Sequence, residues 1–381
     1  MKHKILLYVL TILILYSCQK NNDKQLTKTI LGEWKYIKTE DQRKPKKSND
    51  VIIPPPWPFG NHIKGFVFSE NNLCENKFGY FKRIKATERE DRKIFFLGTE
   101  TKYKIENDSL KIFDLETKTW ENQKIHSIIG DTLTIKVDDS IFAKYARTEP
   151  KINSNENYDK IIVSSSGCYG SCPVSSISID NNGNVLFYGQ YYNTQNGFFK
   201  SKISKNEYQK IQTSFKKANI KKLEDDYHGS WTDDETITIT FIKNNKIVKS
   251  ISDYGGVSPV ELIWAYTPVR YLYQQVKLTP LKAEKPLLSM WRISFTKGNQ
   301  ICDLSKSESF YLFTEIFKGK ETAYKFENKY TIGFWNDQDK KETIYTDGRY
   351  FKYKDKTIDI GYDFLTVNNL TDKFRQKDKY D

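Results

Sequence analysis

Residues 236–242 read Thr-Ile-Thr-Ile-Thr-Phe-Ile, and this run decides how the middle of the chain folds. Successive side chains of a strand point to opposite faces of a sheet, so the alternation predicts a strand with one apolar face. Working outward, residues 246–252 pair back after Asn244-Asn245, and residues 185–188 return from a turn at Asn182-Gly183. The middle of the chain is therefore expected to contain hairpins.

Helix signals lie between and after these strands. Ser204-Lys-Asn-Glu207 has the pattern of a capping box, which opens a helix. Ser258-Pro-Val-Glu261 has the same pattern, with proline at the favoured first helical position. The order strands, helix, strands, helix predicts an α+β domain over residues 156–278.

The last part of the chain, residues 286–375, is predicted to be a second, smaller α+β domain, set off by prolines. We expect Ser307 to cap a helix that Gly319 ends, with strands on either side of it. The aromatic residues of these strands would fill a thin sheet core or form a platform that stacks on glycans. They are Phe334, Trp335, Tyr345, Tyr350, Phe351 and Tyr353.

The first folded segment, residues 26–148, also alternates. Leu133, Ile135 and Val137 are separated by polar residues, and Asn107-Asp108-Ser109 is a turn signal between such runs. Repeated short strands with turns between them predict a meander or a barrel.

Four motifs of this segment resemble the lipocalin-like domains of bacterial lipoproteins. They are Leu31-Gly32-Glu33-Trp34, Asp108–Ile112, Trp120 and Gly130–Leu133. The resemblance implies a small β-barrel that Gly32–Trp34 closes at one end. The interior of such a barrel holds an apolar ligand or is filled by side chains. The predicted fold class is therefore mainly β with α+β, led by a lipocalin-like barrel.

The N-terminus carries the features of a secretory signal. Lys2 and Lys4 precede an apolar run that is too short to span a bilayer as a helix, so residues 1–17 are predicted to be a signal peptide. The ending Leu15–Cys18 resembles the lipobox of Bacteroidota-type lipoproteins, which implies that Cys18 is acylated with chains such as palmitate. Residues 18–25 would then be a lipidated tether. The expected location is the outer membrane, on its periplasmic or surface side.

Composition limits the classes of partner. The 381 residues include 61 Lys and Arg against 48 Asp and Glu, a formal net charge of +13. Basic chains often bind nucleic acid, but a translocated lipoprotein does not meet chromosomal DNA, so no nucleic-acid partner is expected. The basic residues are interleaved with acidic ones, which is typical of a solvated surface. The alternative is attraction to anionic envelope polymers or lipid head groups.

A cysteine motif follows the strand at residues 160–163. Residues 167–173 read Gly-Cys-Tyr-Gly-Ser-Cys-Pro and, with Gly189 and Thr232-Asp233, resemble an uncharacterised Bacteroidota envelope domain for which no activity is established. In an oxidising compartment Cys168 and Cys172 would form a local disulfide. The alternatives are a thiol-redox pair or a metal site completed by His228 and Asp233.

An acidic loop at residues 225–234 is the other dense polar patch. Functional loops have such compositions, and clustered carboxylates can bind a cation. The alternative is a solvated loop whose side chains cap its own backbone. The candidate ligand or cation residues are Asp226, His228, Asp233 and Asp234.

Three barrel positions resemble periplasmic O-glycosylation sites of the Asp-Ser/Thr-apolar type. They are Ser109, Thr132 and Ser140. The alternative is that acidic and hydroxyl residues simply form the turns that precede strands.

The sequence thus predicts a lipid-anchored envelope protein with a binding or structural role, no cofactor and no catalytic residue assigned. Its ligand would be an envelope polymer, a glycan or a small apolar molecule. One alternative is a thiol-redox or metal-assisted envelope enzyme that uses Cys168, Cys172 and His228. Another is an inhibitor or immunity lipoprotein. Cys74 and Cys302 would pair with each other or remain buried thiols.

Overall fold

The computed structural model describes residues 22–43, 63–84, 93–150, 152, 154–282, 292–335 and 340–378. The chain divides into two compact units, one from residues 1–82 and 96–151 and the other from residues 83–95 and 152–381. The predicted fold class, mainly β with an N-terminal barrel and further α+β segments, is confirmed.

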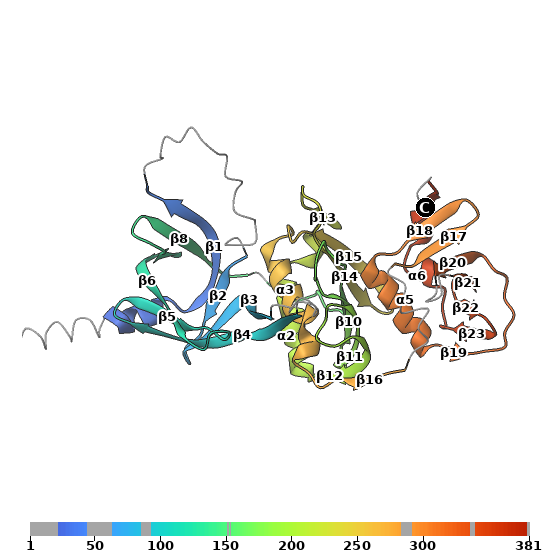
Figure 1. The fold of residues 1–381 in the computed structure, drawn as a ribbon, viewed down its shortest axis with the longest axis horizontal. Helices are drawn as coiled ribbons and strands as arrows, with labels where there is room; N and C mark the ends of the chain where they lie inside the picture. Colours follow the sequence, from blue (N-terminus) through green and yellow to red (C-terminus); the bar gives the residue numbers. More distant parts are fainter. Residues whose placement is uncertain are drawn as a thin grey trace, which may run out of the picture. The chain divides into compact units, whose positions relative to one another are not determined.

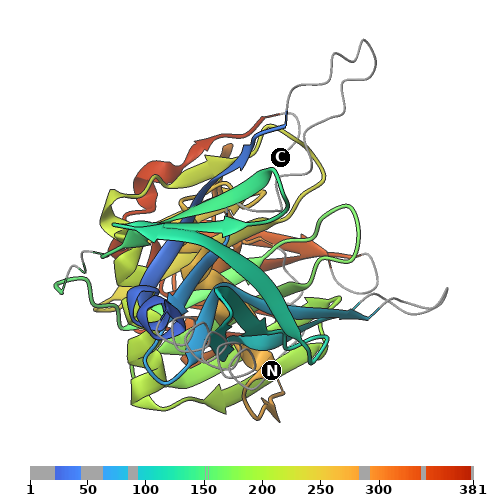
Figure 2. The ribbon, with the colours of Figure 1, turned by 90° about the vertical axis from the view of Figure 1, so that its left-hand side faces the viewer.

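The first unit is a closed eight-stranded barrel whose strands follow in chain order, with β1 paired to β8 (Figures 1 and 2). The strands are β1 (Gly32–Asp41), β2 (Gly65–Phe68), β3 (Leu73–Ile84), β4 (Lys93–Glu106), β5 (Ser109–Phe113), β6 (Trp120–Ile129), β7 (Thr132–Lys136) and β8 (Ile141–Thr148). The meander predicted from the alternation is therefore present.

The interior of the barrel is packed with apolar side chains. Phe68 and Tyr103, for example, have ring centroids 4.9 Å apart. Trp34 has no exposed surface, and its Nε1 donates to Ile30 O at 2.6 Å. The Arg147 guanidinium lies 4.3 Å from the centre of the Trp34 ring, so this cation covers the buried indole.

Residues 22–29 form a helix, although we expected residues 18–25 to be a polar tether. The described part of that segment is attached to the β4–β5 turn. The Asp23 carboxylate accepts from the backbone N–H groups of Asn107 and Asp108, each at 3.1 Å.

The second unit begins with an eight-stranded sheet in the order β13-β15-β14-β9-β10-β11-β12-β16. Its strands are β9 (Lys160–Ser165), β10 (Val174–Asp180), β11 (Asn184–Tyr191), β12 (Gly197–Lys202), β13 (Asp226–His228), β14 (Thr236–Lys243), β15 (Lys246–Tyr254) and β16 (Thr279–Pro280). The hairpins predicted at residues 182–183 and 244–245 join β10 to β11 and β14 to β15.

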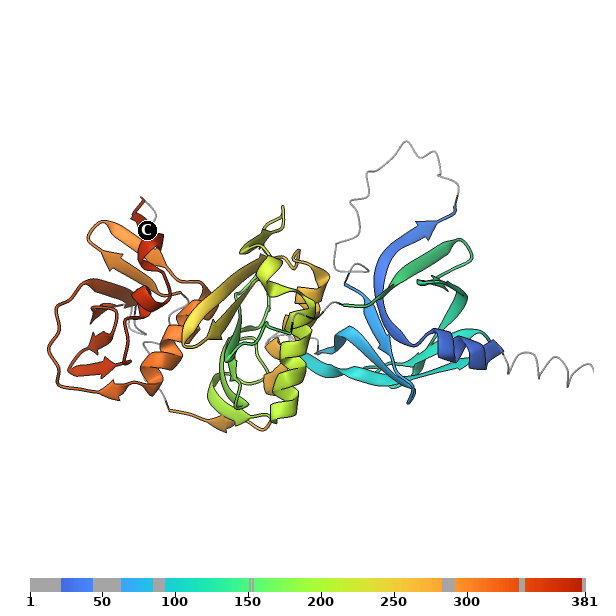
Figure 3. The ribbon, with the colours of Figure 1, turned by 180° about the vertical axis from the view of Figure 1, so that it is seen from behind.

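The apolar face of this sheet is covered by two helices, α2 (Lys205–Lys217) and α3 (Val260–Arg270) (Figure 3). The predicted capping box of Ser204 and Glu207 is present. The second one is not, because Pro259 occupies the N-cap. Instead, Ser258 Oγ donates at 2.6 Å to the carboxylate of Asp253. That carboxylate is fully buried, and a buried charge is costly unless it is hydrogen-bonded.

The opposite face of the sheet carries hydroxyl groups and is covered by α5 (Lys306–Lys318). Thr240 Oγ1 and Ser307 Oγ share a hydrogen bond of 2.7 Å, and Ser307 N donates to Thr238 Oγ1 at 3.0 Å. Lys160 Nζ lies 2.9 Å from Glu315 Oε1. The helix therefore docks on the sheet through these polar contacts and through apolar ones, such as the Phe198 ring of β12, whose centroid lies 5.3 Å from that of Phe313.

The other side of α5 faces a second sheet, in the order β19-β23-β22-β21-β20-β17-β18-β24, so the helix lies between two sheets (Figure 1). The strands are β17 (Ser294–Lys297), β18 (Gln300–Asp303), β19 (Lys320–Glu321), β20 (Tyr330–Trp335), β21 (Lys341–Thr346), β22 (Tyr350–Tyr353), β23 (Lys356–Asp359) and β24 (Arg375–Gln376). The short helices of the unit are η1 (Ile220–Lys222) and η2 (Leu272–Gln274), which precede this sheet in the chain, and α6 (Phe364–Val367) and η3 (Thr371–Lys373), which follow β23.

One expectation for this segment changes. The N-cap of α5 is Ser305, not Ser307, and its hydroxyl forms a capping box with Glu308. Of the aromatic residues considered for glycan stacking, Phe334 and Phe351 are buried in the core. Tyr345 is 44% exposed. The second unit shares one core between its two sheets, and our boundary between residues 278 and 286 stays a prediction.

Candidate functional site

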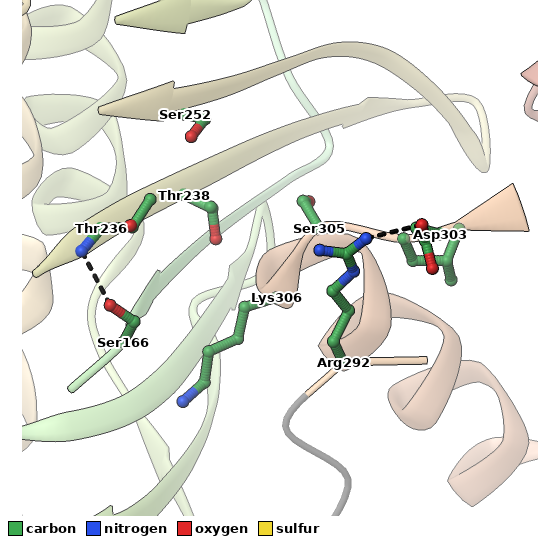
Figure 4. Close-up of a pocket in the computed structure, with 9 residues that line it drawn as sticks. Ser166, Thr236, Thr238, Ser252, Arg292, Asp303, Ser305 and Lys306 are labelled. Atoms are coloured by element: carbon green, nitrogen blue, oxygen red, sulfur yellow. Dashed lines mark hydrogen bonds and ion pairs between the residues drawn. The ribbon is translucent and has the colours of Figure 1, made fainter. Parts of the chain in front are cut away.

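The candidate site is a cavity of about 380 Å³ in the second unit, where polar and charged side chains gather. It lies where the hydroxyl face of the first sheet meets the start of α5 (Figure 4). Eight of the nine residues that line it are polar or charged. The lining residues are Ser166, Thr236, Thr238, Ser252, Arg292, Asp303, Leu304, Ser305 and Lys306.

The strand alternation places the hydroxyl groups in this wall. Thr236 and Thr238 are two residues apart on β14, so their side chains share a face, and Ser252 of β15 is the register partner of Thr238. Ser305 adds the N-cap hydroxyl of α5 from the other side of the cavity. Strands β14 and β15 and the helix start thus supply one continuous polar surface.

Ser166 connects the cavity to the cysteine motif. Its Oγ accepts from Thr236 N at 2.8 Å and donates to Gly167 O at 2.9 Å. Beyond Gly167, Cys168 and Cys172 form a disulfide, as predicted. The loop that the disulfide closes therefore begins at the edge of the cavity.

The disulfide loop also fixes the neighbouring acidic loop. Tyr169 N donates to Asp233 O at 3.1 Å, while the Tyr169 side chain is 89% exposed. Behind the loop, Arg270 donates to the Glu235 carboxylate in a two-pronged ion pair, with Nη1 and Oε1 at 2.6 Å. Arg270 Nη2 also donates to Pro173 O at 3.3 Å. Helix α3, the start of β14 and the cysteine motif meet at this buried pair.

An arginine–carboxylate cluster stands at one side of the cavity. Arg292 Nη2 lies 2.7 Å from Asp303 Oδ2, and Arg375 Nη2 lies 2.8 Å from the same oxygen. Burial opposes ionisation of Asp303, but the hydrogen bonds from Ser294, Arg375 and Arg292 outweigh it and lower the pKa of this carboxyl. Asp303 is therefore ionised and forms ion pairs with both arginines.

Lys306, the first residue of α5, is the other basic residue that lines the cavity. Its Nζ donates to Gln190 Oε1 of β11 at 2.6 Å. Burial and the positive charge of Arg270 lower the pKa of Lys306 to about 7. A large fraction of this amine is therefore neutral at physiological pH.

The acidic-loop residues organise their own loop. The Asp234 carboxylate accepts from Trp231 Nε1 at 3.0 Å and from Glu235 N at 2.8 Å. The His228 ring stacks on Tyr254 with centroids 4.5 Å apart, and Asp226 lies on β13 beside it. Within the described ranges, no three His, Cys, Asp or Glu side chains are arranged to hold a metal ion. Asp234 thus binds groups of its own loop, and cation binding by the four residues stays a prediction.

Other predicted residues lie elsewhere. Ser109, Thr132 and Ser140 are partly exposed at turns of the barrel, and their glycosylation stays a prediction. Cys18 is outside the described residues. Cys74 and Cys302 are both buried free thiols, so the pairing that we considered for them is not found.

Comparison with protein families identifies the middle of the chain. A family model described as a domain of unknown function, DUF6438, matches residues 159–273. These residues form a DUF6438 domain. The match covers the segment for which the cysteine motif suggested an uncharacterised domain, and neither a curated protein nor a solved structure is significantly similar to the chain. No helix in the described part of the chain has the length and apolar character needed to cross a membrane.

The DUF6438 domain supplies only part of the cavity. Ser166, Thr236, Thr238 and Ser252 come from it, whereas Arg292, Asp303, Ser305 and Lys306 come from the segment that follows. Our sequence reasoning did not single out these later residues. One local signal was available, because Ser305-Lys-Ser-Glu308 has the capping-box pattern that places Lys306 at a helix start.

Proposed function

We propose that this protein is a lipid-anchored cell-envelope protein that binds a small, anionic, hydroxyl-rich molecule in the cavity beside α5. An acidic or phosphorylated sugar has this chemistry. The observation that carries the proposal is the composition of the cavity wall, in which hydroxyl groups face one another beside Arg292 and Lys306. Hydroxyl groups both donate and accept, which matches the ring hydroxyls of a sugar.

The charge and size of the cavity support an anion. A helix start carries partial positive charge, and α5 begins at the cavity with Ser305 and Lys306. The guanidinium of Arg292 is half-exposed, so it can reach a ligand while it remains paired with Asp303. The volume of about 380 Å³ lies in the range of small-molecule sites, roughly 300–1,000 Å³.

The hydrogen bonds of Asp303 and Ser166 favour binding over catalysis. Asp303 has a lowered pKa and two arginine partners, which makes its carboxylate a weak base. The Ser166 hydroxyl donates to a backbone carbonyl, so its proton is already engaged. These residues are suited to orient a ligand.

The envelope location rests on the N-terminal sequence and on the cysteines. The resemblance of Leu15–Cys18 to a lipobox supports acylation of Cys18. The disulfide between Cys168 and Cys172 supports an oxidising compartment.

A calorimetric titration tests the ligand class. Glucose 6-phosphate and glucuronate are expected to bind, and neutral glucose is expected to bind at least tenfold more weakly. Arg292→Ala and Ser252→Ala should each weaken binding of the anionic sugars. Arg375→Ala is the matched control, because Arg375 binds the same Asp303 but does not line the cavity. Equal affinity for glucose and glucose 6-phosphate, or no effect of Arg292→Ala, would contradict the proposal.

A further inference from the structure

The barrel carries a cavity of its own, of about 340 Å³, on the outer side of its wall. Four neighbouring strands, β6, β7, β8 and β1, supply it. The apolar residues of β7, such as Leu133 and Ile135, belong to the barrel core, so the alternate residues of that strand face outward. We call this cavity the outer groove, and its lining residues include Glu40, His126, Ser127, Thr134, Phe142 and Lys144.

A β-bulge in β6 turns two consecutive side chains toward the outer groove. Successive residues of a regular strand point to opposite faces of the sheet. The register of β6 against β7 shifts between Ile125 and Ser127, so His126 is an extra residue in β6. As a result, both His126 and Ser127 line the groove. Bulges redirect side chains in this way and are frequent beside active sites.

The groove offers both hydroxyl groups and apolar surface. Ser127 and Thr134 are register partners on β6 and β7, so their hydroxyls share one face. Thr134 is only 6% exposed, and its hydroxyl has no hydrogen-bond partner within the described part of the chain. The buried Phe142 ring lies edge-on to the His126 ring, with centroids 4.8 Å apart. Ile129, which also lines the groove, is 74% exposed.

The charged groups of the outer groove neutralise each other. The Glu40 carboxylate accepts from Lys144 Nζ and from Lys38 Nζ, each at 2.8 Å. These hydrogen bonds, first that of Lys144, lower the pKa of Glu40 to about 2 and keep it ionised. An anionic ligand would compete with Glu40 for Lys144, whereas an uncharged ligand leaves the pair intact. A carboxylate has about four acceptor sites, so Glu40 can still accept from such a ligand.

We propose that the outer groove binds an uncharged N-acetylated sugar. The ring hydroxyls would pair with Ser127 and Thr134, the acetamido N–H would donate to Glu40, and the methyl group would pack on Ile129. A bound peptide strand fits less well, because every strand of the closed barrel is already paired on both sides and offers no free edge. The proposal is independent of the cavity beside α5, which belongs to the other unit.

NMR of the histidine rings tests this proposal, because the chain contains only four histidines and His126 lines the groove. The full chain, isotope-labelled on histidine, is titrated with N-acetylglucosamine. We expect the His126 signals, assigned by their loss in His126→Gln, to shift to saturation while those of His228 in the other unit stay constant. Unchanged His126 signals, or equal shifts for the two histidines, would overturn the proposal. A response to trialanine and none to the sugar would assign the groove to peptides instead.

Two comparisons test the predicted contacts. Glucose has a hydroxyl in place of the acetamido group and should move the His126 signals with several-fold lower affinity. Thr134→Val keeps the shape of the side chain but removes its hydroxyl, and should weaken binding of N-acetylglucosamine several-fold. Thr148→Val is the matched control, because Thr148 lies on β8 outside the groove. Equal affinity for the two sugars, or equal effects of the two variants, would contradict the proposal.

The same titrations separate this proposal from the proposed function. Arg292→Ala alters the cavity beside α5 and should leave the response of His126 to N-acetylglucosamine unchanged. If glucose 6-phosphate binds the wild-type protein in calorimetry and His126 does not respond to N-acetylglucosamine, only the outer-groove proposal fails. If His126 responds and glucose 6-phosphate does not bind, only the proposed function fails.

Discussion

Gln190 Oε1 lies 2.6 Å from Lys306 Nζ, so a strand of the DUF6438 domain is joined to the first residue of a helix that lies outside the family match. The same helix is held by the hydrogen bond between Thr240 and Ser307 and by the ion pair between Lys160 and Glu315. The cavity therefore exists only because the segment after the DUF6438 domain docks on the domain's hydroxyl face.

Replacing Lys306 with methionine should change how stability depends on pH. The folded protein holds the pKa of Lys306 at about 7, below the ordinary value of 10.5, so the unfolded chain binds more protons between these values. The penalty is complete below about pH 7 and is relieved as the pH rises toward 10.5. Lys306→Met should therefore stabilise the protein most below about pH 7, as measured by urea unfolding across this range. A constant difference at all pH values would contradict the lowered pKa.

The buried pair of Arg270 and Glu235 should be the most sensitive polar contact of the second unit. Glu235→Gln leaves the buried guanidinium uncompensated, so we expect a loss of about 3–5 kcal/mol in the free energy of unfolding. Asp139→Asn, which breaks the exposed pair with Lys136, is the control and should cost much less, because solvent screens that pair. Chemical denaturation gives both values, and similar costs for the two variants would contradict the structural role.

The disulfide should act as a local staple. Because the loop between Cys168 and Cys172 is short, chain entropy predicts that replacing both cysteines with serine costs about 2 kcal/mol. The variant should still fold, and its cavity should still bind glucose 6-phosphate. A variant that melts at the wild-type temperature would show that the bond has no structural role. A folded variant that has lost binding would favour a functional role for the cysteines.

The contact between Arg147 and Trp34 should stabilise the barrel. The guanidinium lies over the indole and also donates to Leu31 O and Thr29 O. Arg147→Met should cost about 1–3 kcal/mol, from the lost stacking and the unpaired carbonyls. Arg147→Lys should recover little, because an ammonium lacks the planar fork. Full rescue by lysine would show that charge alone matters.

Acylation of Cys18 can be measured directly. Peptide mass spectrometry of protein extracted from membranes should find a mature chain that begins at Cys18 and carries acyl chains. Cys18→Ser should release the protein into the soluble fraction. An unmodified Cys18 in membrane-extracted protein would remove the basis for the anchor.

Periodicity predicted the strands well because each face of a sheet has its own environment. The alternation in residues 236–242 buries Ile237 and Ile239 on one face of the sheet, as expected. It does not show what covers the hydroxyl face, because Thr238 and Thr240 would look the same facing water. That α5 covers them depends on a segment far along the chain, which no local pattern specifies.

The caps show where local rules compete. Ser204 and Glu207 form the predicted box, and Ser305 with Glu308 fits the same rule better than Ser307, which lacks a glutamate three residues on. Ser258 fits the pattern and fails, because the buried carboxylate of Asp253 takes its hydroxyl. Burial of one carboxylate therefore outweighs a capping preference worth about 1 kcal/mol.

The candidate site was the least predictable part. Arg292 and Lys306 are ordinary surface-type residues in the sequence, and more than fifty residues separate each of them from Thr236 and Thr238. The cysteine motif is conspicuous in the sequence, but in the structure its cysteines form a local disulfide at the edge of the cavity and do not line it. The chemistry comes from tertiary contacts that bring the two segments together.

The most direct test of the account is a crystal structure of the protein with glucose 6-phosphate. The account predicts the ligand inside the cavity, with its phosphate within hydrogen-bond distance of Arg292 or Lys306 and its ring hydroxyls on Thr236 or Ser252. Electron density for the ligand at another place, with this cavity filled only by water, would contradict the central claim.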